Sequence, residues 1–221
     1  MSGDTQLRIY ESNIEEYGKI IIENGSFSIG IVPEIGGKIL NLLNKNTEMF
    51  FCIHDLKYLP KDLKDKESVA DFRKGYRYLP PGGYKAWLSP QDKWGWPPYM
   101  DLEAGEYEET LLETKERIEV KLKSPICRES KMQMERRIIL EKINECRVIE
   151  RLINCGDAAE EYGIWAVTQF KRKGKVIFPI GDKKEIKNLG GKGYEHCTEI
   201  ITLDNKNYSV VSCVDKKDFK I

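Results

Sequence analysis

The sequence predicts an all-β protein, a large antiparallel β-sandwich formed by one domain over residues 1–221. Three observations support this fold class. Most apolar residues recur with the two-residue step of a strand rather than the 3.6-residue step of a helix. Short polar turns separate at least seven such runs. A chain of 221 residues suits a single domain and is long enough to bury roughly 70% of its unfolded surface.

The first predicted strands form a hairpin near the N-terminus. In residues 26–32, apolar side chains alternate with serine and glycine, so one face of this strand is apolar. Asn24 and Gly25, just before it, are typical of a tight hairpin turn. Residues 19–23 are therefore expected to form the partner strand. The two glycines at 36 and 37 lack a phosphate-loop spacing and are expected to permit a positive-φ bend between strands.

Further runs of alternating residues predict the rest of the sandwich. Residues 56–75 are the exception, because they are rich in Lys and Asp, and they are interpreted as a surface helix or an insertion. The predicted strands are 118–123, 132–140, 147–154, 163–170, 175–180, 199–203 and 208–214.

The composition excludes several classes of partner. The 36 Lys and Arg balance the 36 Asp and Glu, so no net field attracts nucleic acid or an anionic membrane. No run of eighteen apolar residues and no apolar leader is present, so we expect a cytoplasmic protein that does not span a membrane. The six cysteines are scattered without metal-ligand spacing, which predicts reduced thiols and no metal or other cofactor.

Residues 80–98 give the strongest functional clue. They hold three of the four tryptophans together with five prolines and three glycines, which predicts a long, stiff loop. Rigid aromatic faces beside Lys85, Gln91, Asp92 and Lys93 are typical of a site for a polar ligand with an apolar face, and a sugar fits this description. The alternative is that these tryptophans close one open end of the β core.

Three blocks, taken in order, resemble a known group. They are ENGSFSIGIVPEIGGKILNL at 23–42, GGYKAWLSPQDKWGWPP at 82–98, and the hairpin of 135–170 that contains GIWAVTQF. Together they resemble an uncharacterised bacterial family within the galactose mutarotase-like, or aldose 1-epimerase-like, superfamily. The resemblance implies a twisted supersandwich that binds a sugar in an open groove on one sheet face.

The sequence departs from the mutarotase pattern in two places. Mutarotases use a His as acid and a Glu as base at the anomeric centre, since ring opening needs both. No His lies in 162–170, where Trp165 and Gln169 are found instead. The chain also ends at Ile221, where relatives are expected to continue for several strands, so the predicted sandwich is C-terminally incomplete. An exposed sheet edge would favour a homo-oligomer.

These arguments lead to two sets of candidate residues and three functional hypotheses. The first hypothesis is an aldose 1-epimerase-like enzyme, the second a non-catalytic carbohydrate-binding module or sensor, and the third a domain whose aromatic segment is an interface. Acids at 92, 101 and 103 are also explained by turn capping or solvation, and both histidines by structural roles. The sugar-binding candidates are Lys85, Trp87, Trp94, Trp96, Trp165 and Gln169, and the catalytic candidates are His54, Asp92, Asp101 and His196, with Glu103 as a further acid.

Overall fold

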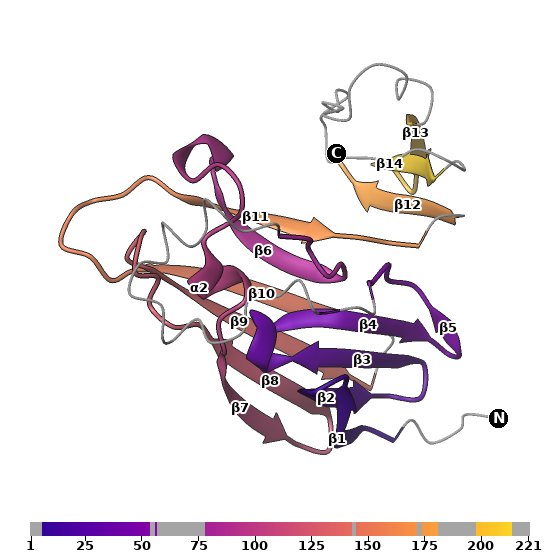
Figure 1. Cartoon of the computed structure of the whole chain (residues 1–221). Helices are drawn as coiled ribbons and strands as arrows, with labels where there is room; N and C mark the ends of the chain where they lie inside the picture. Colours follow the sequence, from indigo (N-terminus) through magenta and orange to yellow (C-terminus); the bar gives the residue numbers. More distant parts are fainter. Residues whose placement is uncertain are drawn as a thin grey trace. The chain divides into compact units, whose positions relative to one another are not determined.

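The structure, a computed structural model, is built almost entirely of antiparallel β-strands (Figure 1). It describes residues 6–53, 56, 78–142, 145–171, 174–180 and 198–213. The chain divides into two compact units, residues 1–170 and 171–221, and each is described by itself. The all-β class predicted from the sequence is therefore confirmed.

The first unit contains two sheets. The larger has seven strands in the order β1-β2-β3-β4-β6-β11, with the short β5 paired to β4. A 3-10 helix, η1, follows β3 and ends at Gly36, whose φ is 76°. The strands of this sheet are β1 (Arg8–Ile14), β2 (Tyr17–Glu23), β3 (Phe27–Val32), β4 (Lys38–Asn44), β5 (Thr47–Glu48), β6 (Tyr84–Ser89) and β11 (Gly163–Thr168), and η1 is Pro33–Ile35.

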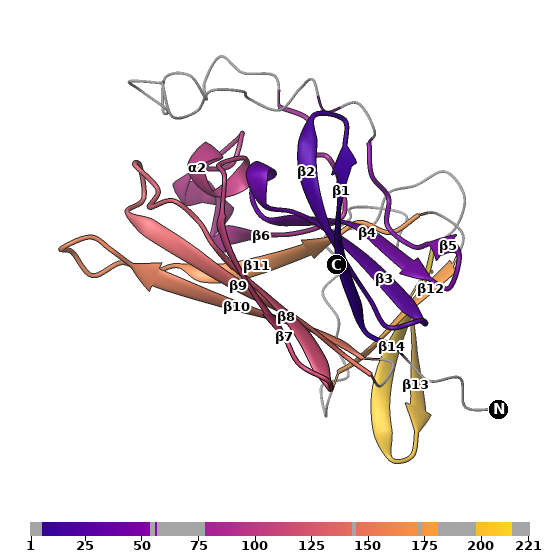
Figure 2. The ribbon, with the colours of Figure 1, turned by 90° about the horizontal axis from the view of Figure 1, so that it is seen from below.

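The smaller sheet has four strands in the order β10-β9-β8-β7, and it packs against the larger one as a sandwich (Figure 2). Its strands are β7 (Glu108–Glu113), β8 (Arg117–Lys123), β9 (Met132–Glu141) and β10 (Cys146–Asn154). Apolar side chains of both sheets meet in one core because alternate residues of each strand point to the same side. Its central members are Ile22, Ile29, Ile31, Ile39, Ile118, Val120, Leu122, Ile138 and Leu140.

The hairpin predicted at the N-terminal side is confirmed. The side chain of Asn24 accepts hydrogen bonds from the backbone of Ser26 and Phe27, at 3.1 and 2.8 Å, while Gly25 has a φ of 78°. The later strands also lie within two or three residues of their predicted bounds. The sequence analysis missed β1 and β7, and both have mostly or fully exposed side chains, so they carry little apolar alternation.

The prediction of one continuous loop over residues 80–98 is wrong at its centre, where β6 forms. Pro80 and Pro81 precede this strand and Pro90, Pro97 and Pro98 follow it, so none of the five prolines falls within Tyr84–Ser89. Proline excludes a strand only where its missing N–H is needed, so the six residues between are free to pair. After β6 come η4 (Gln91–Lys93) and the short helix α2 (Met100–Glu103).

A buried arginine on β9 joins the two sheets. Arg136 Nε lies 2.5 Å from Glu150 Oε1, and its Nη1 donates to the carbonyl oxygens of Gly36 and Gly37 in the turn before β4. Its guanidinium also lies 5.3 Å from the ring centroid of Tyr84 on β6. Its charge therefore stabilises the fold only while these partners compensate its desolvation.

The second unit is a three-stranded antiparallel sheet in the order β12-β14-β13. Val210 and Val211 of the central strand are buried, whereas Ile177, Ile200 and Leu203 of the outer strands are exposed. Its strands are β12 (Gly174–Pro179), β13 (Thr198–Leu203) and β14 (Lys206–Cys213).

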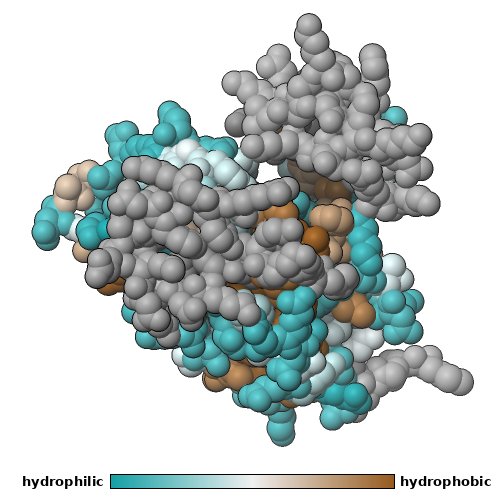
Figure 3. All heavy atoms as spheres, in the orientation of Figure 1, coloured by the Kyte–Doolittle hydropathy of each residue, from teal (hydrophilic) through white to brown (hydrophobic). Residues whose placement is uncertain are grey.

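The surface seen in Figure 3 is mostly hydrophilic over the described residues, with apolar side chains in small groups between charged ones. Among the described residues, no helix is long and apolar enough to cross a membrane.

Candidate functional site

The pairing of β6 with β11 brings the central candidates onto one sheet face (Figure 1). Trp87 lies directly opposite Trp165, and Lys85 lies opposite Val167. Residues directly opposite each other share a face, and residues two apart on a strand do so too. Because Ala86 and Leu88 pack toward the smaller sheet, Lys85 and Trp87 point to the other side. The sequence spacing also predicted that Lys85 and Trp87, two residues apart, lie on the same face.

All four tryptophans of the chain meet around Trp87. The ring centroid of Trp87 lies 5.4 Å from that of Trp165, 5.9 Å from that of Trp94 and 6.0 Å from that of Trp96, each in an edge-to-face arrangement. Such pairs are favourable beyond the area that they bury. Trp96 is 51% exposed, so the cluster reaches the surface there. Three separate segments of the sequence therefore form one aromatic surface, which we call the aromatic cluster.

A buried carboxylate lies beside this cluster. Glu103, in the last turn of α2, is 1% exposed and accepts a 2.7 Å hydrogen bond from Trp87 Nε1 through Oε2. Its Oε1 accepts from the Tyr78 hydroxyl and lies 3.2 Å from Lys38 Nζ. Lys38 Nζ also donates to the backbone oxygen of Glu103. The ion pair thus fixes α2 to β4 and orients the central indole.

A second buried lysine lies on the same face. Lys85 is 2% exposed, and its Nζ donates a 2.8 Å hydrogen bond to Gln169 Oε1 and lies 5.3 Å from the Trp87 ring centroid. The backbone of Gln169 is held by two 2.9 Å hydrogen bonds, one donated by Gln169 to Gly83 and one donated by Phe51 to Gln169. The backbone of Gln169 is therefore fixed in place although it follows the end of β11.

Burial sets the electrostatics of Lys38. Desolvation lowers the pKa of Lys38 to about 8, with Glu103 opposing this effect and Lys85 adding to it. Desolvation also lowers the pKa of Lys85. Burial acts in this direction because it penalises the charged form of a lysine. Both ammonium groups are thus easier to deprotonate than a lysine in water.

The shift at Lys38 predicts a pH dependence of stability. A folded-state pKa near 8, below the unfolded value of 10.5, means that the unfolded chain binds more protons between these values. The contribution of Lys38 to the free energy of unfolding should therefore rise by about 1 kcal/mol per pH unit between about pH 8 and pH 10. Urea unfolding of the wild type and of Lys38→Met at several pH values measures this contribution. It is the difference between the free energies of unfolding of the two proteins at each pH.

Taking the difference removes the effects of other groups. Burial raises the pKa of Cys146 to about 11, which lowers stability over part of the same range in both proteins. Lys121→Met, which changes an exposed lysine of β8, is the matched control and should show no pH-dependent difference from the wild type. A wild-type advantage over Lys38→Met that stays constant or shrinks with pH would contradict the expectation.

The remaining candidates lie elsewhere or have other roles. Trp94 is 5% exposed and donates from Nε1 to the Leu88 carbonyl, so it closes the core as the alternative interpretation expected. Asp101 is also buried and forms an ion pair with Arg128 at 2.6 Å. Asp92 is exposed on η4.

His54 and His196 lie outside the described residues, as do nearly all of residues 56–75.

Sequence reasoning missed two residues that contact the Glu103 carboxylate, Lys38 and Tyr78. The signal for Lys38 was present, because it stands in step with Leu40 at the start of an apolar strand. A lysine on the buried face of a strand needs a partner, which indicates an ion pair or a site. Tyr78 lies in a segment without periodicity and had no comparable signal.

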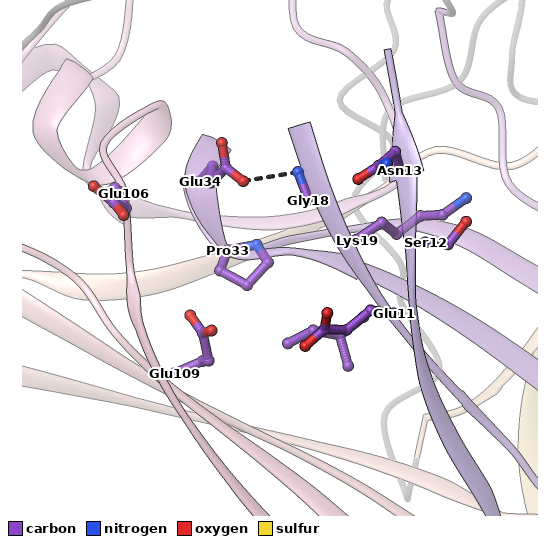
Figure 4. Close-up of a pocket in the computed structure, with 10 residues that line it drawn as sticks. Glu11, Ser12, Asn13, Gly18, Lys19, Pro33, Glu34, Glu106 and Glu109 are labelled. Carbon is purple, nitrogen blue, oxygen red and sulfur yellow. Dashed lines mark hydrogen bonds between the residues drawn. The ribbon is translucent and has the colours of Figure 1, made fainter. Parts of the chain in front are cut away.

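A hollow of about 350 Å³ lies elsewhere in the first unit, between β1, β2, η1 and the start of β7 (Figure 4). Glu11, Glu34, Glu106 and Glu109 line it, and Glu34 accepts a 2.7 Å hydrogen bond from the backbone of Gly18. Within the described part of the chain, no three His, Cys, Asp or Glu residues are grouped to hold a metal ion. The hollow contains none of the predicted site residues.

Comparison with known proteins gives little similarity. No protein-family model matches the chain, and no curated protein matches it. Among solved structures, the crystal structure of 4-alpha-glucanotransferase from Thermococcus litoralis aligns with a TM-score of 0.49 and 12% sequence identity. The alignment covers 95% of this chain but 39% of that one. These comparisons do not identify a family.

Proposed function

We propose that this is a carbohydrate-binding protein of galactose mutarotase-like character, which holds a sugar against the aromatic cluster of the first unit. The observation that carries the proposal is the meeting of four tryptophans around Trp87, with Trp96 half exposed at the surface. Polar groups lie on the same face, among them Lys85 and the partly buried Gln169.

This combination suits a sugar for a physical reason. A pyranose presents C–H groups on its ring faces and hydroxyls around its edge. Exposed indole faces cover the C–H groups at a low cost in conformational entropy, while amide and charged side chains bind the hydroxyls. The Lys85 and Gln169 pair supplies the cation and the amide that this mode of sugar binding uses. Protein interfaces carry such groups as well, so sugar titration separates the two hypotheses.

Action at the anomeric centre is the second candidate function. Its acid and base would come from Lys38 and Glu103 beside Trp87, and because both side chains are only 1% exposed, this function requires that a sugar displace the groups that cover them. Polarimetry of freshly dissolved α-sugars separates the two candidates. An aldose 1-epimerase-like enzyme accelerates mutarotation over buffer, whereas a binding module or sensor leaves the rate unchanged.

The Trp96→Ala variant tests the proposal. Loss of its exposed ring should weaken sugar binding by about 1–2 kcal/mol, or roughly 5–30-fold in Kd. The free energy of unfolding should fall by about 1–3 kcal/mol, because the buried half of the ring and its contacts with Trp87 and Tyr78 are lost. Titration of a panel of neutral and acidic sugars, followed by the fluorescence of the remaining tryptophans, measures the affinity.

Tyr10→Ala provides a matched control. Tyr10 is 46% exposed and lies on β1, at the opposite edge of the larger sheet from β6 and β11. Its removal should leave sugar affinity unchanged. Equal affinities of Trp96→Ala and the wild type would remove the aromatic cluster from sugar binding, and no response of the wild type to any sugar would favour the interface hypothesis.

A further inference from the structure

Lys85 is a buried ammonium group without a carboxylate of its own. Among the described residues, the neutral Gln169 Oε1 is the one acceptor that hydrogen-bonds its Nζ, although an ammonium group has three donors. The nearby Glu103 carboxylate already serves Lys38, Tyr78 and Trp87. The two lysines and one glutamate therefore leave one positive charge uncompensated in this group.

Such an arrangement is costly in a protein without a ligand. A buried charge is normally paired and fully hydrogen-bonded, since it has lost its hydration. Desolvation lowers the pKa of Lys85, and Glu103 offsets this only in part. A bound anion would restore the balance, because an oxyanion accepts hydrogen bonds and supplies the missing negative charge.

The position of Lys85 relates this charge to the aromatic cluster. Lys85 and Trp87 are two residues apart on β6, and Trp165 lies opposite Trp87. Gln169, which holds the ammonium group, is only partly buried, and its backbone is fixed by Gly83 and Phe51. A ligand oxygen that displaces its side-chain amide from Lys85 would therefore leave the strand pairing unchanged.

We propose that the site selects an anionic sugar, whose carboxylate or phosphate pairs with Lys85 while its ring lies against the aromatic cluster. This inference rests on the carbohydrate-binding function proposed above and adds its substrate class. A sugar carboxylate and a sugar phosphate supply the same chemistry, because each is an oxyanion attached to a pyranose ring. The neutral sugars of the same shape lack the group that compensates Lys85.

Calorimetric titration of the wild type with glucose, glucuronate and glucose 6-phosphate tests the inference. We expect at least one charged sugar to bind about tenfold or more tightly than glucose at low salt. Comparing glucuronate with glucose 6-phosphate tells whether the oxyanion is a carboxylate or a phosphate. Inorganic phosphate and acetate show whether the sugar ring contributes, and either of them binding as tightly as the charged sugar would overturn the inference.

Lys85→Met keeps most of the side-chain length and removes the charge. The preference for the charged sugar should disappear in this variant and persist in Lys121→Met, which removes an exposed charge from β8. Should Lys85→Met fail to fold, the wild-type comparison still decides. Equal binding of glucose and both charged sugars would overturn the anionic class but leave carbohydrate binding intact, whereas silence toward every sugar would overturn the proposed function itself.

Discussion

Replacing Arg136 with methionine is expected to lower the free energy of unfolding by about 3–5 kcal/mol, the loss typical of breaking a buried ion pair from one side. The guanidinium is the partner of Glu150, whose side chain is only 8% exposed. Among the described residues, Glu150 Oε2 already lacks a hydrogen-bond partner, so the variant would leave this carboxylate with the Tyr84 hydroxyl alone. Urea or thermal unfolding measures the loss.

The neighbouring residue supplies a matched control. Arg137 lies on the same strand and pairs with Glu119 at 2.6 Å, but its side chain is 39% exposed. Arg137→Met should therefore lower the free energy of unfolding much less than Arg136→Met does. A double variant, Arg136→Met with Glu150→Leu, should be more stable than Arg136→Met alone, because no unpaired charge stays buried. If Arg136→Met and Arg137→Met were equally stable, Arg136 would not be a compensated charge that joins the sheets.

Replacing Gly83 with alanine is expected to lower the free energy of unfolding by about 2–5 kcal/mol, from positive-φ strain and overpacking together. The φ of Gly83 is 64°, and a Cβ there would lie 2.1 Å from the backbone oxygen of Ile39. Backbone atoms of β4 cannot move aside as a flexible side chain does, so the start of β6 must shift. Because Gly83 also accepts the hydrogen bond from Gln169 N, sugar affinity should fall with stability.

Gly25→Ala separates the two contributions. Gly25 has a similar φ of 78°, but a Cβ there meets no atom within 4 Å. Its replacement should cost only the strain, about 1 kcal/mol. Unfolding curves of both variants, with sugar titrations beside them, make the comparison. A Gly83→Ala variant as stable as Gly25→Ala would mean that β4 and β6 do not approach as closely as described.

Much of the fold is predictable from local sequence. The Asn24 turn, the positive-φ bend at Gly36 and the alternating strands β8 to β10 follow from side-chain period and turn chemistry, which act over a few residues. Strands β1 and β7 were missed because their exposed residues carry no apolar pattern. Strand β6 was missed because the prolines on both sides of it predicted a loop, although its own six residues contain no proline and can pair.

The candidate site was predictable as a set of residues but not as an arrangement. Trp87, Trp165, Lys85 and Gln169 were named from their spacing on two segments, and the structure brings them together. Trp94 was grouped with them and contacts Trp87, but its own side chain is buried and closes the core. The links from Glu103 to Lys38 and Trp87 join residues far apart in the chain, and no local pattern specifies such pairs.

By itself, the sequence determined the all-β class, the balance of charge and the identity of the aromatic and polar side chains available for a site. These features depend on composition and on periods of a few residues, so they can be predicted from the sequence alone. Only the tertiary structure decided that four tryptophans meet at Trp87, that Lys38 pairs with Glu103 and that Lys85 is held by the amide of Gln169. The physical reason is that strand pairing between distant segments sets which side chains lose water together, and that loss of water gives a lysine its need for a partner.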